Sequence, residues 1–180
     1  MEKMVSVWVA ADPGESVSAI RDQAERENEA LQLSGFSLSL PSHISLKISF
    51  PVAESLFDAV VERITALLSG KSGFSVPVKG LERQENILWI AMGESKELSA
   101  LHEMLDACME REFAVERHAF DRCYQFHSTL FMDGNEEKMA EMERRLQAFP
   151  LPAFVQVEGF MIGCSREEEP GVYRVIRRFA

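Results

Sequence analysis

A short pattern occurs twice in this sequence, and the pair constrains the fold more than any other feature. The first copy, residues 43–50, reads His-Ile-Ser-Leu-Lys-Ile-Ser-Phe, and the second, residues 126–131, reads Phe-His-Ser-Thr-Leu-Phe. Alternation of polar and apolar side chains is typical of a β-strand that buries one face. Each copy is followed by a helical pattern and then by a strand that contains Val-x-Gly, so the sequence predicts two similar halves.

Both copies place a histidine and a hydroxyl side chain on one strand face. His43 and Ser45 are two residues apart in the first copy, as His127 and Thr129 are in the second. If the strands come together, two imidazoles and two hydroxyls form a group of acid, base and oxyanion-holding donors that suits phosphoryl chemistry. Lys47 lies on the same predicted face as His43, where it either reaches a phosphate or emerges into water.

The His43-Ile-Ser-Leu and His127-Ser-Thr-Leu elements resemble the two H-x-T/S-x motifs of the two-histidine (2H) phosphoesterase superfamily. That superfamily includes the 2'-5' RNA ligase-like proteins and the RNA 2',3'-cyclic phosphodiesterases. The resemblance covers essentially the whole chain. It implies a bilobal fold and metal-independent hydrolysis or reversible ligation at 2',3'-cyclic or 2',5' linkages of RNA or small nucleotides. The functional positions that it carries over are His43, Ser45, His127 and Thr129.

The second motif departs from the usual family pattern. Family members often have a proline before the histidine and a basic residue soon after the Thr-Leu pair. Here Phe126 precedes the histidine, and residues 131–133 read Phe-Met-Asp. The resemblance therefore implies the type of reaction more directly than the class of substrate.

Outside the two copies, the spacing of apolar residues predicts further strands and helices. We expect strands at 4–10, 74–81, 87–92, 154–162 and 172–179, and helices at 16–33, 51–68, 95–112 and 136–146. Residues 36–40 are predicted to form a short edge strand or an extended loop, and residues 113–123 a connector. The whole pattern predicts an α+β fold in one domain, residues 1–180, with two β-α-β-β lobes related by a pseudo-twofold axis and mainly antiparallel sheets around a central cleft.

Composition restricts the kinds of ligand that the protein can bind and indicates the compartment in which we expect it. The formal net charge of −10 disfavours coating of long duplex nucleic acid, which requires many Lys and Arg contacts to phosphates, but it allows a nucleotide or an RNA end in a locally positive cleft. The three cysteines lack C-x-x-C spacing, so we expect reduced thiols in a cytoplasmic protein, without a disulfide framework or a zinc site. Neither a signal peptide nor a membrane-spanning stretch is recognisable, and we expect a monomer that binds no membrane.

The predicted site consists of His43 and His127 as catalytic residues, with Ser45, Thr129 and Lys47 as phosphate-binding residues. An unperturbed imidazole has a pKa near ~6.5, so one ring can accept a proton while the other donates one. The residues alone do not decide which histidine is the base. No cofactor and no metal are expected. The alternative function is a non-catalytic nucleotide-binding module of the same fold.

The remaining histidines have no predicted role. His102 lies in a charged helical stretch and His118 in an irregular one, so both are predicted to be solvated surface residues. Trp89 and Tyr173 lie on predicted strands, where each either stacks on a base or packs in the interior.

Overall fold

The computed structural model describes residues 2–169 and 172–180, apart from the side chains of residues 36 and 37. The α-helices and strands, in chain order, are β1 (Met4–Asp12), α1 (Ser18–Leu31), β2 (Ile44–Ala53), α2 (Phe57–Leu68), β3 (Phe74–Gln84), β4 (Ile87–Met92), α3 (Lys96–Phe113), β5 (His127–Met132), α4 (Glu136–Gln147), β6 (Phe154–Val157), β7 (Gly159–Arg166) and β8 (Arg174–Phe179). A short 3-10 helix at Phe36–Ser39 stands where the sequence predicts an edge strand or an extended loop, and another lies within the predicted connector at Ala119–Cys123.

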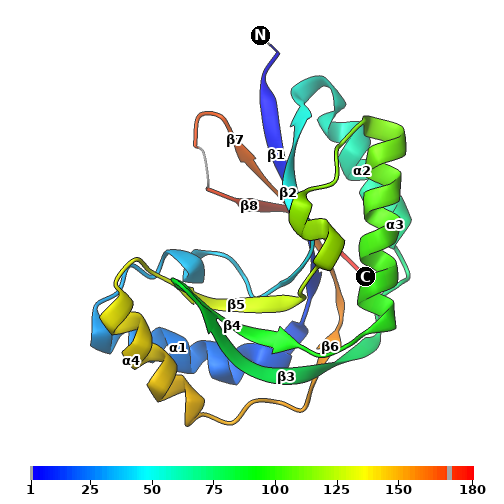
Figure 1. The fold of residues 1–180 in the computed structure, drawn as a ribbon. Helices are drawn as coiled ribbons and strands as arrows, with labels where there is room; N and C mark the ends of the chain where they lie inside the picture. The colour runs from blue at the N-terminus through cyan, green and yellow to red at the C-terminus, as the bar shows by residue number, and fades with distance from the viewer. Residues whose placement is uncertain (1, 170–171) are drawn as a thin grey trace.

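The strands form two four-stranded sheets, in the orders β2-β1-β7-β8 and β5-β4-β3-β6 (Figure 1). Every pairing is antiparallel, so the predicted α+β class with mainly antiparallel sheets is confirmed. Helices α2 and α3 lie together beside the first sheet, and α1 and α4 lie together below the second. No helix in the described ranges has both the length and the apolar character needed to cross a membrane.

The two halves of the chain exchange strands. Motif strand β2 shares its sheet with β7 and β8 from the second half, whereas motif strand β5 pairs with β4 from the first half. The expected single strand over 154–162 is in fact two, because the chain leaves one sheet after Val157 and enters the other at Gly159. Each motif strand is therefore the edge strand of its sheet, and β2 and β5 contact each other between the sheets.

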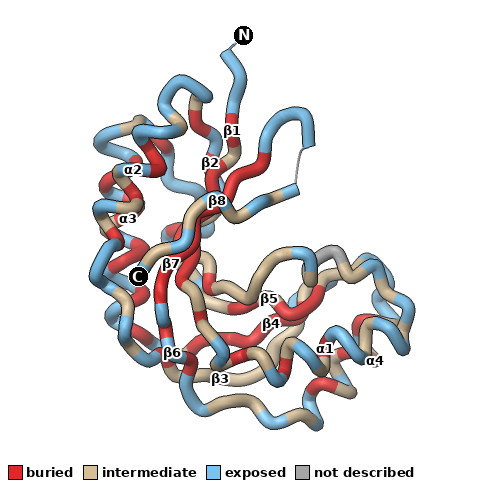
Figure 2. The backbone as a smooth tube through the Cα atoms, turned by 180° about the vertical axis from the view of Figure 1, so that it is seen from behind, coloured by how far each residue is buried: buried red, intermediate tan, exposed pale blue. Residues whose placement is uncertain are grey.

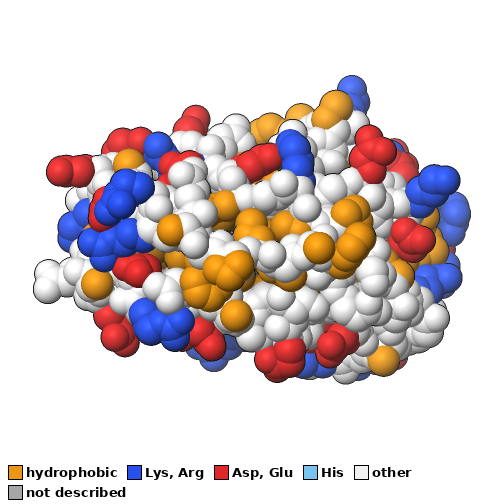
Figure 3. Space-filling model, turned by 90° about the horizontal axis from the view of Figure 1, so that it is seen from below, with side chains coloured by type: hydrophobic (Ala, Val, Ile, Leu, Met, Phe, Trp, Pro, Cys, Tyr) orange, Lys and Arg blue, Asp and Glu red, His pale blue; other side chains and the backbone are white. Residues whose placement is uncertain are grey.

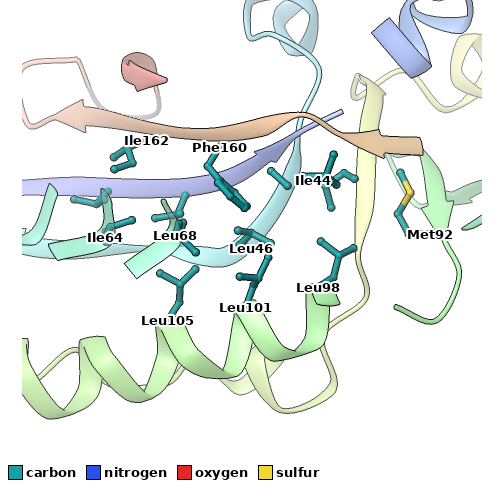
Figure 4. Packing of buried hydrophobic residues seen from close by; sticks show 14 of the residues in the cluster. Ile44, Leu46, Ile64, Leu68, Met92, Leu98, Leu101, Leu105, Phe160 and Ile162 are labelled. Atoms are coloured by element: carbon teal, nitrogen blue, oxygen red, sulfur yellow. The ribbon is translucent and has the colours of Figure 1, made fainter. Parts of the chain in front are cut away.

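One hydrophobic core connects the two sheets with the helices. Buried positions follow β1, β2, β4, β5 and β7, whereas the outer faces of the helices are exposed (Figure 2). Figure 4 shows how α3 inserts Leu98, Leu101 and Leu105 towards Leu46 of β2 and Phe160 of β7. The three helix positions recur every three or four residues, as the sequence predicts for one buried stripe.

A β-bulge interrupts each motif strand at the leucine that follows the Ser or Thr, and the β1–β2 pairing has a second irregularity between Val7 and Val9. In β2 the register moves from Ala10↔Ser45 to Val9↔Lys47, which leaves Leu46 as an extra residue. In β5 it moves from Trp89↔Thr129 to Leu88↔Phe131. A bulge reverses the alternation beyond it. Lys47 and Phe131 therefore occupy equivalent positions, and both are buried.

On the face shown in Figure 3, hydrophobic side chains gather in the middle and charged side chains lie around them. Acidic and basic groups are interspersed there, in keeping with a chain in which acidic residues outnumber basic ones. This face offers no continuous basic track for a phosphate backbone.

Candidate functional site

The first histidine of the site stands at the beginning of its strand. His43 immediately precedes β2, and its Nδ1 lies 2.8 Å from the carbonyl oxygen of Pro41. A carbonyl oxygen can only accept a hydrogen bond, so Nδ1 must carry the proton. In the neutral ring, Nε2 is then left with its lone pair free for chemistry. His43 and Ser45 are both half-buried.

The second histidine has the same arrangement. His127 is the first residue of β5, and its Nδ1 lies 2.8 Å from the carbonyl oxygen of Gln125, again two residues upstream. The same argument places a proton on Nδ1 and leaves Nε2 free. Thr129, two residues further, is half-buried like Ser45. The two motifs therefore present their imidazoles in matched tautomers.

An indole ring contacts each imidazole, although the two contacts differ. Trp8 of β1 meets His43 edge-on, with ring centroids 4.5 Å apart and an interplanar angle of 85°, and its Nε1 donates a hydrogen bond of 3.2 Å to Ser45 Oγ. Trp89 of β4 lies more nearly parallel to His127, at 4.6 Å and 30°. Trp89 is only 8% exposed, which agrees with interior packing.

Sequence reasoning missed Trp8 because its role depends on strand pairing. Both tryptophans come from the first half of the chain, and each lies on a strand that pairs with one of the motif strands, which no local sequence signal shows. Space for the Trp8 ring exists because Gly163 lies opposite it on β7, where a Cβ would come within 2.6 Å of Trp8 Cε3.

Burial lowers the basicity of both imidazoles. The pKa of His43 falls to about 4, mainly because of burial and to a smaller extent because of positive charge on His127 and Arg21, against the opposing effect of the Pro41 carbonyl. Burial also lowers the pKa of His127, against the Gln125 carbonyl. The strands that begin at or next to these rings, β2 and β5, contact each other. In the free protein both rings are neutral near pH 7.

Lys47 does not join this site, so its predicted role in phosphate binding is wrong. Its side chain is 2% exposed, and its ammonium forms ion pairs with Asp106 of α3 and, at 2.9 Å, with Asp121. The bulge after Ser45 turns Lys47 away from the face that carries His43. Strict alternation over residues 43–50 assigns Lys47 to the wrong face because nothing in the sequence pattern indicates the bulge.

His102 is also not where the sequence placed it. Instead of being solvated, it is 3% exposed, and its ring nitrogens lie 2.8 Å from the Leu46 carbonyl oxygen and 2.9 Å from that of Asp121. His118 is exposed, as predicted, and caps the 3-10 helix that follows it.

His102, Asp106 and Asp121 offer ligand atoms within 4.8 Å of one another, which is a spacing compatible with a metal ion. One oxygen of each carboxylate and both ring nitrogens already have partners, however. Lys47 bonds both carboxylates, and both ring nitrogens of His102 face carbonyl oxygens. A buried ionic cluster describes this group better than a metal centre.

A cavity of about 670 Å³ lies next to the segment that precedes His127, although none of the four motif residues lines it. Its walls come from the β3–β4 hairpin, the start of α3 and the segment just before β5, and include Trp89, Tyr124, Gln125 and Phe126. Lys79 and Lys96 also line it, together with Glu82 and Glu94. Aromatic walls and a few charged groups are typical of a small-molecule site.

A family model described as the 2'-5' RNA ligase superfamily matches residues 9–163, which include both histidine motifs. The chain belongs to this superfamily. No curated protein sequence matches the chain significantly.

Solved structures agree with the superfamily fold. The apo form of LigT from E. coli is 17% identical, with a TM-score of 0.61 over 98% of this chain and 97% of that one. TT0787 from Thermus thermophilus is 19% identical, with a TM-score of 0.63 over 97% and 96%. E. coli LigT complexed with 3'-AMP is 15% identical, with a TM-score of 0.62 over 98% of each chain. At these identities the likeness establishes the fold of this superfamily member.

Proposed function

We propose that this member of the 2'-5' RNA ligase superfamily is a metal-independent phosphodiesterase. Its substrates would be 2',3'-cyclic phosphates or 2',5' linkages at RNA ends or in small nucleotides. The observation that carries the proposal is the matched pair His43 and His127, each held through Nδ1 by a backbone carbonyl and each two residues before a hydroxyl side chain. Two oriented imidazoles that share one space can flank one phosphorus atom.

The reaction needs one neutral ring and one protonated ring. The neutral imidazole takes a proton from the attacking water, and the protonated one delivers a proton to the departing ribose oxygen. Ser45 and Thr129 donate hydrogen bonds to the non-bridging oxygens as negative charge develops there. Because burial lowers both imidazole pKa values in the free protein, the proton of the acid enters together with the anionic substrate, whose charge raises the pKa of the ring beside it.

The size and charge of the site favour a small ligand. The cavity of about 670 Å³ beside Trp89 is large enough for a nucleoside, and Lys79 and Lys96 at its walls suit a further phosphate. The E. coli LigT structures with 3'-AMP and with ATP support a nucleotide in the corresponding fold. The net charge of −10 opposes long nucleic acid.

A reducing compartment such as the cytoplasm is part of the proposal. Cys108 and Cys164 are buried free thiols, and Cys123 is an exposed free thiol. Burial raises the pKa of both buried thiols, which keeps them in their unreactive form.

The second candidate is a nucleotide-binding module without turnover. The observation that favours it is the low pKa of both histidines in the free protein, because a site without a protonated ring lacks a general acid. Turnover separates the two candidates.

The deciding experiment follows 2',3'-cyclic nucleotides by phosphorus NMR in the presence of EDTA. We expect wild-type protein to open the ring to a monoester, and His43→Ala or His127→Ala to lower the rate by at least ~100-fold, the usual scale for losing a general acid or base. His118→Ala, at an exposed histidine outside the site, is the matched control and should retain the wild-type rate. Binding of the nucleotide without product from wild type would instead favour the module.

A further inference from the structure

The ring of His102 on α3 makes a pair of contacts that a neutral imidazole cannot satisfy. Nδ1 lies 2.8 Å from the Leu46 carbonyl oxygen and Nε2 lies 2.9 Å from the Asp121 carbonyl oxygen. A neutral ring has one N–H and one lone pair, so one of these oxygens would face a lone pair. At 3% exposure no bulk water is available to relieve that repulsion. Only an imidazolium donates to both carbonyls.

The charges around the ring support the same protonation state. Lys47, Asp106 and Asp121 are each at most 2% exposed. Burial acts to raise the pKa of Asp121, but hydrogen bonds from Lys47 and from the His118 backbone lower it overall, so this carboxylate is ionised. One ammonium and two carboxylates leave one uncompensated negative charge, which is costly in the interior. A positive charge on His102 brings the sum to zero.

Two carboxylate oxygens of this cluster, Asp106 Oδ2 and Asp121 Oδ1, are buried without a hydrogen-bond partner among the described residues, and the position of the first agrees with this charge balance. Asp106 Oδ2 lies 3.6 Å from His102 Nε2. Arg117 comes next, with its Nε 3.8 Å from the same oxygen, but it is 32% exposed and also pairs with Glu103 and Glu110. Apart from Lys47, the imidazolium is therefore the nearest fully buried positive charge to this oxygen.

His102 joins the two halves of the proposed site. The Leu46 carbonyl follows Ser45 on the first motif strand, whereas the Asp121 carbonyl belongs to the segment that leads into His127. The Tyr124 ring stacks on His102, with centroids 4.5 Å apart and an interplanar angle of 23°, and the Tyr124 hydroxyl interacts with the Ser45 side chain. One buried ring thus contacts the backbone beside Ser45 and the segment that carries the Gln125 carbonyl.

We propose that His102 is a buried imidazolium that positions both motif strands of this superfamily member. Its two N–H groups tie β2 to the segment before β5, and the tie sets the separation of the two reacting imidazoles. The charged groups that face it are Lys47 of β2, Asp106 of α3, Asp121 of the 3-10 helix and, at the rim, Arg117. The positioning role rests on the proposed phosphodiesterase function, whereas the charge of the ring does not.

Ring nitrogen chemical shifts test the charge directly. We expect a long-range proton–nitrogen spectrum of the wild-type protein at pH 7.5 to place both nitrogens of His102 in the protonated range. A freely exposed imidazole is mostly neutral at that pH, because its pKa is ~6.5. The exposed ring of His118 provides the internal comparison. A single nitrogen of His102 in the unprotonated range overturns the proposal.

Substitution tests the positioning role. His102→Phe keeps a ring against Tyr124 but removes both donors. We expect it to lower kcat on a 2',3'-cyclic nucleotide by about 10- to 100-fold with KM changed less than ~2-fold, since small displacements of reacting groups act on the transition state. The ring resonances of His43 and His127 should shift as well. Glu137→Gln, at an exposed residue of α4, is the control and should leave kcat and both resonances unchanged.

The outcomes separate this proposal from the proposed function. If wild-type protein shows no turnover, the phosphodiesterase fails, and the shift of the His43 and His127 resonances in His102→Phe still decides whether His102 positions them. If wild type is active and His102→Phe retains its kcat and its resonances, the positioning role is wrong. The spectrum of the wild-type ring decides the charge even if the variant fails to fold.

Discussion

At the scale of single residues, hydrogen bonds select the tautomer of each motif histidine, and burial keeps its ring neutral. The carbonyls of Pro41 and Gln125 hold Nδ1 protonated in the two rings, and burial lowers both pKa values. Under the proposed function, the site takes up a proton together with its anionic substrate, because a nearby negative group compensates a charged ring for lost hydration.

The low pKa of His43 makes stability depend on pH. It is about 4 in the folded state and ~6.5 in the unfolded state, so between these values the unfolded chain binds more protons. The neutral ring contributes about 1–2 kcal/mol to the free energy of unfolding, a value reduced because the ring is only half-buried. This contribution is complete above pH ~6.5 and is lost as the pH falls towards 4. Urea unfolding at pH 4.5 and 7 should show a smaller difference for His43→Gln than for wild type. An equal difference in both proteins would contradict the pKa.

The hydrogen bond from Trp8 to Ser45 yields a second prediction at this scale. Trp8→Phe keeps a ring beside His43 but removes the N–H donor, and we expect about a 5-fold lower rate on a cyclic nucleotide, the value of one hydrogen bond of ~1 kcal/mol. If Trp8 acts through Ser45, the same change in a Ser45→Ala background should have no further effect. Additive losses would show that it acts by another route.

At the scale of elements, the two bulges decide which side chains reach the site. Each reverses the alternation after the Ser/Thr-Leu pair, so Lys47 in the first half and Phe131 in the second point into the interior. Phe131 fits an apolar interior without a partner. Lys47 requires Asp106 and Asp121, and this requirement explains why the first half contains a buried ionic cluster.

Replacing Lys47 distinguishes a structural ion pair from a phosphate ligand. Lys47→Met leaves two buried carboxylates without their ammonium, and we expect the free energy of unfolding to fall by about 3–5 kcal/mol. Lys79→Met, at an exposed lysine of β3, should change stability little. If the Lys47→Met protein is stable but has lost affinity for inorganic phosphate, Lys47 is a phosphate ligand after all.

At the scale of the whole molecule, exchange of strands makes each lobe depend on both halves of the sequence. The sheet of β2 is completed by β7 and β8, and the sheet of β5 by β3 and β4. The two histidines come from opposite halves of the sequence, and a core that spans both sheets packs against the strands that carry them.

This exchange predicts how fragments behave. Residues 1–94 contain β1 and β2 but lack β7, which covers the other side of β1. We expect that fragment alone to unfold without a cooperative transition in urea, because the uncovered strand exposes its hydrogen-bonding edge and apolar face. Mixing it with residues 95–180 should restore a cooperative transition. Independent cooperative folding of residues 1–94 would show that the lobes are separable.

The predictable features were those encoded in neighbouring residues. Alternation and helical spacing predicted the α+β class and nearly all of the helices and strands. The repeated pattern predicted that His43 and His127 are the catalytic residues, and that assignment stays a prediction. The predictions that failed depended on distant partners. The sequence predicts one strand over residues 154–162, because no feature of the neighbouring residues indicates that the chain changes sheets after Val157. His102 read as solvated because its two acceptors are supplied by other elements.

The sequence by itself determined the superfamily fold and the two His-x-Ser/Thr pairs, because the side-chain period of a strand and the repetition of a motif are local properties. Only the tertiary structure decided which strands share a sheet, where the bulges fall, and that Lys47 and His102 lie in the interior. The physical reason is that the burial and charge of a side chain depend on what packs against it, and here those groups come from the far half of the chain or from a helix that follows.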